Sequence, residues 1–129
     1  MGTRKFITVG ENIPKSTAPI SQAVVAGNYC HISGQLAIDK NGHFVNGTIE
    51  VQTKMAFDNF FAVISEAGFT IDEIVFIDIA FINLNDLEFV NPYFDGLFET
   101  GKKPARTIYQ AAALPAGAKI KIMGVAIKT

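Results

Sequence analysis

The feature that most constrains the fold is a run of nine residues, Ile74 to Ile82, in which Asp78 is the only residue that is not apolar. Its β-branched and aromatic content and its short length are typical of a strand. A strand that is apolar on both faces must be covered on both faces. We therefore expect a strand from Ile74 to about Leu84 inside a sheet. Helices should cover one of its faces and other copies of the chain the second, which predicts an oligomer.

One long helix is predicted between Thr48 and Gly68. The Thr48 side chain can accept a hydrogen bond from the free amides of the first turn, and glycine suits the left-handed residue that follows many helices. Between them, apolar residues recur at helical spacing, which gives the helix one face that can cover a sheet. These residues are Ala56, Phe57, Phe60, Val63, Ile64 and Ala67.

A second helix is predicted from Asn85, which has the spacing of a capping box with Glu88, to about Thr100. Pro92 lies inside this segment, and a proline removes one helical hydrogen bond and clashes with the preceding turn. We therefore expect a kink at Pro92, or a restart of the helix with Asn91 as a new cap.

The other segments are short strands separated by turn residues. In the last of them, alternation places Ile120, Ile122, Gly124 and Ala126 on one face and Met123, Val125 and Ile127 on the other. The order of strands, helix, strand, helix and strands predicts an α+β fold, with two helices on one face of a mixed sheet. The expected strands are 5–9, 23–26, 29–33, 104–112 and 119–127, with turns at 27–28, 39–42 and 114–117, and the last two strands are joined by their turn.

The composition fits one domain and favours self-association. By surface scaling, a chain of 129 residues buries roughly two-thirds of its unfolded surface, so we expect a single domain over residues 1–129. Hydrophobic residues make up 49% of the chain and charged residues 18%. This is apolar for so small a monomer, and other copies of the chain are expected to cover part of the surface.

Charge and cysteine content argue against several classes of partner. A net charge of −1 gives no basic stripe for nucleic acid, and no apolar run reaches the ~18 residues of a membrane span. A single cysteine, Cys30, cannot form an intrachain disulfide, which suits a reducing compartment. Residues 1–6 lack the apolar region of a signal peptide. We therefore expect a cytoplasmic protein with neither nucleic-acid nor membrane partners.

Arg106 stands out because it is a permanent cation at the start of an apolar strand. Such a side chain needs an anionic partner. The carboxylate of a small ligand is one candidate, and an internal ion pair with Asp78 or Glu99 is the other.

Four short motifs follow one another along the chain: Ala18–Ala23, Ser33–Gln35, Asn83–Asp86, and Pro104–Arg106 followed by Leu114-Pro115. Together they resemble the reactive-intermediate deaminase (Rid, YjgF-like) family, which also carries the label L-PSP endoribonuclease. The similarity covers nearly the whole chain.

The resemblance implies a chorismate-mutase-like fold and a homotrimer with ligand clefts between neighbouring subunits. Family members hydrolyse enamines and imines derived from amino acids to a 2-keto acid and ammonia, without metal or organic cofactor. Water must add across a C=N bond, so such a site needs a carboxylate anchor, a proton relay to nitrogen and a group that orients the water. The expected partner is a small metabolite that bears a carboxylate.

The resemblance also suggests which residues form the site. Arg106 matches the family's carboxylate-binding arginine, Ser33 and Gly34 match a Ser-Gly pair that lines the cleft, and Asn91 matches a helix asparagine near it. Arg106 and Ser33 are the catalytic candidates, and all four are substrate-binding candidates. Asn91 has the helix-cap role as its alternative.

Three further substrate-binding candidates depart from the family pattern. Ile20 stands where active members usually carry a Tyr, Ile108 where many carry a Cys, and Met123 where the last strand carries the Glu credited with positioning water. A thioether cannot take a proton at neutral pH, and losing a general base typically costs ~10²–10⁴ in rate. If these three residues face one cleft, the resemblance implies a pocket that keeps its cation and selects a carboxylate attached to an apolar body.

Other polar residues are weaker candidates for a catalytic role. Asp78 is the first candidate for a replacement acid or base, with pairing inside an oligomer interface as the alternative. Tyr109 is a second candidate, as a hydroxyl that takes the place of the missing Tyr. His31 and His43 do not have the spacing of a metal site, and Cys30 is expected to be an inert buried thiol.

Two functions fit these observations. The first is an enamine/imine deaminase acting on 2-imino acids derived from amino acids, weak or altered in specificity because of Met123 and Ile20. The alternative is a non-catalytic trimeric binder or sensor of small carboxylates, which the same two residues favour. A ribonuclease comes last, since the chain shows neither a basic, aromatic-interleaved surface nor a catalytic pair of histidines or carboxylates.

Overall fold

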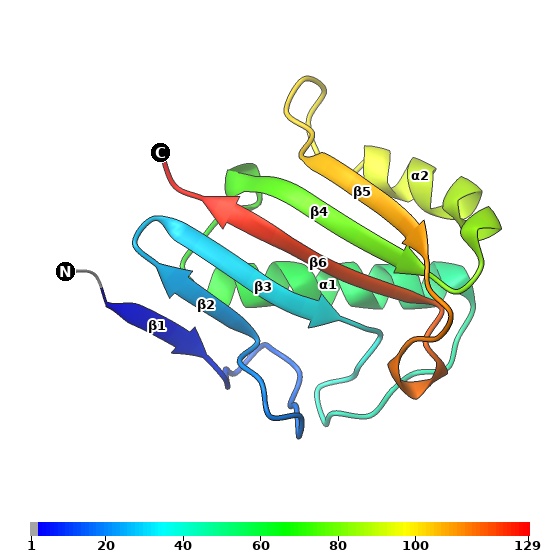
Figure 1. The fold of residues 1–129 in the computed structure, drawn as a ribbon, viewed down its shortest axis with the longest axis horizontal. Coiled ribbons are helices and arrows are strands. Elements are labelled where there is room, and N and C mark those ends of the chain that lie inside the picture. Colours follow the sequence, from blue (N-terminus) through cyan, green and yellow to red (C-terminus); the bar gives the residue numbers. More distant parts are fainter. Residues whose placement is uncertain (1–2) are drawn as a thin grey trace.

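Six strands form one mixed sheet in the order β1-β2-β3-β6-β4-β5 in the computed structural model, which describes residues 3–129 (Figure 1). Met1 and Gly2, part of the stretch inspected for a signal peptide, lie outside the described residues. The strands are β1 Arg4–Ile7, β2 Ala23–Ala26, β3 Tyr29–Gln35, β4 Ile74–Phe81, β5 Ala105–Gln110 and β6 Ile120–Ile127. The helices are α1 Ile49–Glu66 and α2 Leu87–Asp95, with 3₁₀ turns at Ile71–Glu73, Leu84–Asp86 and Pro115–Gly117.

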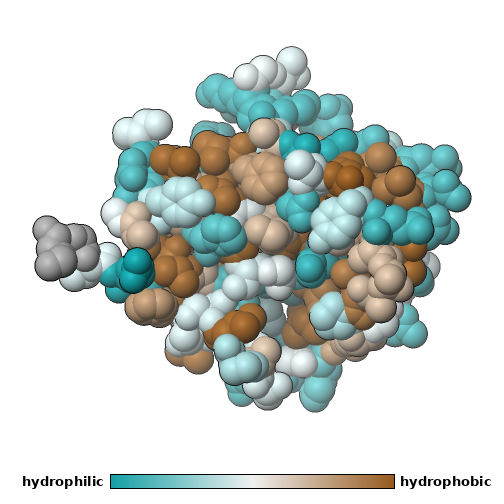
Figure 2. Space-filling view, in the orientation of Figure 1, coloured by the Kyte–Doolittle hydropathy of each residue, from teal (hydrophilic) through white to brown (hydrophobic). Residues whose placement is uncertain are grey.

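Both helices cover the same face of the sheet, as expected for an α+β fold with two helices (Figure 1). The alternation predicted for β6 is confirmed: Ile120, Ile122, Gly124 and Ala126 are buried under α1, and the intervening residues are only half-buried. We call the uncovered face of the sheet its open face. Figure 2 shows this face, on which apolar and polar side chains are interspersed.

The apolar strand β4 lies inside the sheet, between antiparallel β6 and parallel β5. It ends at Phe81 and not at Leu84, because the next residues leave the ladder for a 3₁₀ turn in which Asn83 accepts a hydrogen bond from the amide of Asn85. One chain covers only one face of β4, and Phe76 and Asp78 remain half-buried on the open face. The covering of that face by other copies stays a prediction.

Two strands near the carboxyl end form as predicted, but they do not pair with each other. Both β5 and β6 pair with β4, on its two sides. β5 is parallel to β4 and forms the edge of the sheet. The predicted turn at 115–117 joins them along the chain, but β4 offers backbone partners on both sides and lies between them in the sheet. The edge strand β5, which carries Arg106, lies next to α2 (Figure 1).

The structure confirms the two predicted ends of the long helix α1. Thr48 is the N-cap, and its hydroxyl accepts a hydrogen bond from the Val51 amide at 3.2 Å. Gly68 has a φ of 85°, in the left-handed region where a glycine avoids the steric cost of a Cβ. The residues that α1 buries in the core include Ala56, Phe57, Phe60, Val63 and Ile64.

The second helix forms, but both of its ends differ from the prediction. It begins at Leu87 after the 3₁₀ turn and ends at Asp95, five residues before Thr100. The Asn85 capping box does not form, because Asn83 caps the 3₁₀ turn instead. The helix continues through Pro92 without a restart. Asn91 is not a helix cap, because its side-chain oxygen accepts a hydrogen bond from Arg106.

The amino-terminal strands differ from their predictions only at their ends. β1 occupies Arg4–Ile7, where it pairs with β2, and stops before Val9. β2 and β3 form the predicted hairpin around Gly27, which has a φ of 61°. Within residues 3–129, no helix combines the length and apolar character that crossing a membrane requires.

Candidate functional site

Arg106 lies on the helix-covered side of the sheet edge. In the β4–β5 register it faces Ile77, which is buried under the helices. Its guanidinium donates a hydrogen bond from Nη1 to Asn91 Oδ1 at 2.9 Å and lies 4.7 Å from the centre of the Phe94 ring. A side chain held by an amide oxygen and an aromatic face keeps its charge available. The strand edge and α2 therefore present an oriented cation.

No carboxylate neutralises Arg106 within residues 3–129. Asp78 accepts a hydrogen bond from the Thr107 hydroxyl, and Glu99 pairs with Lys102 at 3.5 Å. The alternative of an internal ion pair is therefore wrong. Desolvation lowers the pKa of Arg106 from its ordinary value, but a guanidinium remains protonated in proteins.

A cavity of about 690 Å³ opens beside this cation. Its volume lies within the range typical of small-molecule sites. Its walls come from α2 and from the segment that leads into β5. The lining residues are Glu88, Asn91, Pro92, Phe94, Asp95, Lys103, Pro104 and Arg106. We call it the Arg106 cavity.

Lys103 joins the two walls of the Arg106 cavity. Its ammonium donates hydrogen bonds to the backbone oxygens of Asp95 at 2.8 Å and Phe98 at 3.0 Å, and it lies 3.0 Å from the Asp95 carboxylate. Carbonyl groups at the end of a helix lack intrahelical donors and attract cations. Lys103 therefore satisfies the end of α2 and holds the segment before Arg106 against it.

Ser33, Gly34 and Ile20 do not line the Arg106 cavity. Ile20 and Gly34 line a second pocket of about 370 Å³, whose other walls come from the loop before β2, the end of β3 with the segment that follows it, and the turn at 115–116. The Ser33 hydroxyl donates a hydrogen bond to the Ser21 backbone oxygen at 2.6 Å. The Lys121 side chain covers Gly34, where an added Cβ would lie 2.9 Å from Lys121 Cδ. The two pockets share no lining residue, so one chain keeps the two groups of candidates apart.

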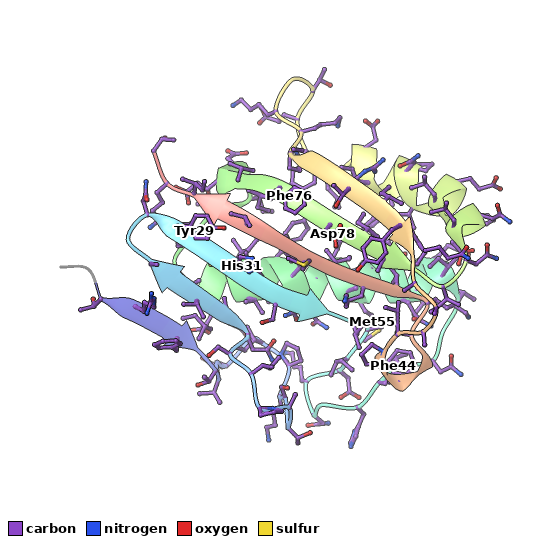
Figure 3. The ribbon with its side chains drawn as sticks, in the orientation of Figure 1. Tyr29, His31, Phe44, Met55, Phe76 and Asp78 are labelled. Carbon is purple, nitrogen blue, oxygen red and sulfur yellow. The ribbon has the colours of Figure 1, made fainter. Side chains whose placement is uncertain are left out.

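Met123 and Tyr109 lie on the open face, away from the Arg106 guanidinium. Met123 pairs with Asp78 across β6 and β4, and Tyr109 pairs with Ala80. Figure 3 shows Asp78 on this face, along with Tyr29, His31 and Phe76. Ile108 is on the same face of β5 as Arg106 but packs against the core. Within one chain, Met123, Tyr109 and Asp78 are therefore not neighbours of the Arg106 cavity.

The sequence reading missed Glu88, Phe94 and Lys103 as cavity residues. The available signal was the helical spacing of Glu88, Asn91 and Asp95, which places them along one side of α2. Lys103 and Phe94 had no comparable signal in the sequence. No group of three or more His, Cys, Asp or Glu residues in the described chain has the arrangement of a metal site.

Cys30 is fully buried, as expected, and burial raises the pKa of its thiol to about 11. A thiol with a raised pKa and no solvent access is a poor nucleophile. This residue therefore has no part in the candidate site.

Comparison with known proteins gives consistent matches over nearly the whole chain. Residues 10–128 match the family described as Endoribonuclease L-PSP. A RutC family protein of Pyrococcus horikoshii is 34% identical over 125 residues, 96% of this chain and 98% of its own length. The human 2-iminobutanoate/2-iminopropanoate deaminase is 34% identical over 116 residues, 89% of this chain and 84% of its own. The crystal structure of a Rid-family protein from Yersinia pestis, 32% identical, has a TM-score of 0.90 and covers 98% of this chain and 100% of that one.

Proposed function

The chain belongs to the endoribonuclease L-PSP family, also called the Rid family, and we propose that it hydrolyses 2-imino acids to 2-keto acids and ammonia. Similarity to proteins named 2-iminobutanoate/2-iminopropanoate deaminase supports this activity. The observation that carries the proposal is the Arg106 guanidinium, which lies in a cavity of small-molecule size without an acidic partner in the described chain.

In the proposed reaction, a water oxygen bonds to the imine carbon, two protons move from oxygen to nitrogen, and the carbon–nitrogen bond breaks. The products are a 2-keto acid and ammonia, so no oxidant or cofactor is consumed. Arg106 binds the carboxylate, and the hydrogen bond to Asn91 fixes its orientation. Holding the carboxylate places the neighbouring C=N carbon at a defined point in the cavity, which lowers the entropy cost of attack.

The proposed assembly is a homotrimer whose neighbouring subunits bring the two groups of site residues together. Two observations support it. The open face carries half-exposed apolar residues that no helix covers, and the Arg106 cavity shares no residue with the pocket of Ile20 and Gly34. Contact between subunits would bring Ile20 and Gly34 of one subunit to the Arg106 cavity of its neighbour. We place this assembly in the cytoplasm, which suits a chain whose single thiol is buried.

The test of the activity is direct. 2-Iminobutanoate is generated continuously from L-2-aminobutanoate by an amino-acid oxidase, and the loss of the imine is followed with and without the protein. We expect accelerated release of 2-oxobutanoate. Arg106→Ala should lower the acceleration by roughly 10- to 100-fold, the value of a hydrogen bond to a charged group. Arg4→Ala, which removes the chain's other arginine from the exposed strand β1, is the control and should keep the wild-type rate. Wild-type protein that leaves the rate unchanged would rule out the deaminase.

A second function, a binder of small carboxylates, is favoured by the separation of the two pockets. Within one chain, the anion-binding part is complete, but Ser33, Gly34 and Ile20 lie elsewhere. A protein that binds 2-oxobutanoate through Arg106 without accelerating imine hydrolysis would have this function. Thermal stabilisation by the ligand, lost in Arg106→Ala, is its expected signature.

A further inference from the structure

We propose that Glu88 determines specificity, by favouring ligands that carry a protonated nitrogen next to their carboxylate. The inference rests on the proposed function, because it concerns the same cavity and the same class of substrate. It concerns a residue to which the sequence gave only a helix-capping role and the family resemblance no role.

The geometry of α2 places Glu88 beside the anion-binding groups. Glu88 and Asn91 are three residues apart on the helix, and both line the Arg106 cavity. Residues at this spacing are neighbours on a helix surface, with Cβ atoms roughly 5–6 Å apart. Asn91 accepts the hydrogen bond from Arg106. The Glu88 side chain therefore begins about one helical turn from the point where Arg106 is held.

Half of the charged side chains that line the cavity form an ion pair within the described chain, and the other half do not. The cavity has two cations, Lys103 and Arg106, and two carboxylates, Glu88 and Asp95. Lys103 and Asp95 neutralise each other at a distance of 3.0 Å. Arg106 and Glu88 form no ion pair with any residue between 3 and 129, and Glu88 makes no side-chain hydrogen bond there. The cavity thus offers one unpaired positive and one unpaired negative group on its walls.

An unpaired cation and anion that do not meet each other suit a ligand that carries both opposite charges. The protonated form of a 2-imino acid is such a ligand, because its iminium nitrogen is attached to the carbon next to the carboxylate. In this arrangement Arg106 binds the carboxylate, and Glu88 attracts the nitrogen. The 2-keto acid product has lost the nitrogen and keeps only its negative charge. Glu88 therefore favours the substrate over the product and aids product release.

The experiment compares two stable ligands that differ in this group alone. L-2-Aminobutanoate and 2-oxobutanoate share their carbon skeleton and carboxylate, but only the first has a protonated nitrogen. Their dissociation constants are measured by calorimetric titration at pH 7 for wild type, Glu88→Gln, Glu99→Gln and Arg106→Ala. Glu99→Gln is the matched control, because Glu99 is an exposed glutamate outside the cavity that pairs with Lys102.

Glu88→Gln should weaken aminobutanoate binding about two- to fivefold, the range of an exposed ion pair, while oxobutanoate binds equally or more tightly. Glu99→Gln should leave both constants unchanged, and Arg106→Ala should weaken both ligands. If Glu88→Gln weakens both ligands equally or neither, while Arg106→Ala still weakens both, Glu88 has no such role and the proposed function stands. If wild type binds neither ligand, both the inference and the proposed anion site are rejected.

Discussion

Asn91 on α2 and Arg106 on β5 are joined by a hydrogen bond of 2.9 Å between the amide oxygen and the guanidinium. Asn91 is the one side chain that holds the guanidinium by a hydrogen bond in the described chain, and Phe94 lies beneath it. An amide oxygen orients the cation without neutralising it, whereas a carboxylate would do both. The choice of asparagine at this position therefore decides whether Arg106 is free for an anion.

The first prediction follows from this contrast. Asn91→Asp should weaken 2-oxobutanoate binding more than Asn91→Ala, because the new carboxylate competes with the ligand for Arg106. We expect a loss of roughly tenfold or more for the aspartate variant, comparable to the loss of a charged hydrogen bond. Titration calorimetry of both variants at pH 7 provides the comparison. Equal losses in the two variants would mean that the new carboxylate does not compete with the ligand for Arg106.

The second prediction concerns Lys103, which caps the end of α2 and lines the cavity. Lys103→Ala removes hydrogen bonds to two backbone oxygens and an ion pair with Asp95. Since the lysine is one-third exposed, we expect a loss of about 1–2 kcal/mol in the free energy of unfolding. Urea denaturation measures it.

Lys102→Ala is the control for this prediction. Its ammonium forms only a 3.5 Å pair with Glu99, and both side chains are well exposed. Such a pair contributes about 0–1 kcal/mol, so this variant should unfold at nearly the wild-type urea concentration. If both lysine variants unfold at the same concentration, the contacts of Lys103 do not hold α2 to the strand.

Local signals were enough to predict both ends of α1, but for α2 they predicted the helix and not its ends or the role of Asn91. Thr48 and Gly68 act on their own helix ends, and no distant residue competes for them. Asn91 had an equally good local interpretation as a cap, but Arg106, fifteen residues later, takes its side-chain oxygen. A sequence pattern cannot reveal such a partner before the strand and helix are placed next to each other.

Only part of the site could be predicted, because the sequence does not show which distant residues become neighbours. The unusual cation in an apolar strand identified Arg106, because a charge without a local partner is visible in the sequence. Its burial beside α2 depends on β5 pairing in parallel with β4, which the sequence did not predict. Glu88 and Lys103 join the cavity through that same pairing, so their roles appeared only with the structure.

The third prediction tests how closely β4 and α1 pack around Gly124 of β6. A Cβ added at Gly124 would lie 2.5 Å from the Phe76 backbone oxygen and 2.8 Å from Phe60 Cζ. Because the first contact is with backbone, it cannot be relieved by a side-chain rotation. Gly124→Ala should therefore lower the free energy of unfolding by about 1–3 kcal/mol, the usual cost of overpacking.

Gly96→Ala is the matched control for Gly124. Gly96 has a φ of −77°, which any residue adopts, and the nearest atom to its added Cβ is 3.6 Å away. This variant should unfold within about 0.5 kcal/mol of wild type, as surface substitutions usually do. A Gly124 variant as stable as the Gly96 variant would show that the β4 backbone and α1 can both move away from Gly124 at little cost.

The fourth prediction concerns the dependence of stability on alkaline pH. Burial raises the pKa of the Cys30 thiol from 9.0 to about 11. In this window the unfolded chain releases the thiol proton while the folded chain keeps it, so the unfolded state binds fewer protons and folding stability falls as the pH rises. Below pH 9 both states hold the proton, and the contribution is fully present.

Other groups also titrate at high pH, so the informative quantity is the difference between wild type and Cys30→Ala. Between pH 8 and pH 11 wild type should lose more unfolding free energy than the variant, by an amount on the order of 1–3 kcal/mol, since each pKa unit corresponds to about 1.4 kcal/mol. Urea denaturation at several pH values measures both slopes. In parallel, the native thiol should react slowly with a thiol reagent at pH 8. Equal slopes for the two proteins, together with fast labelling, would mean that solvent reaches Cys30 and that burial does not hold its proton.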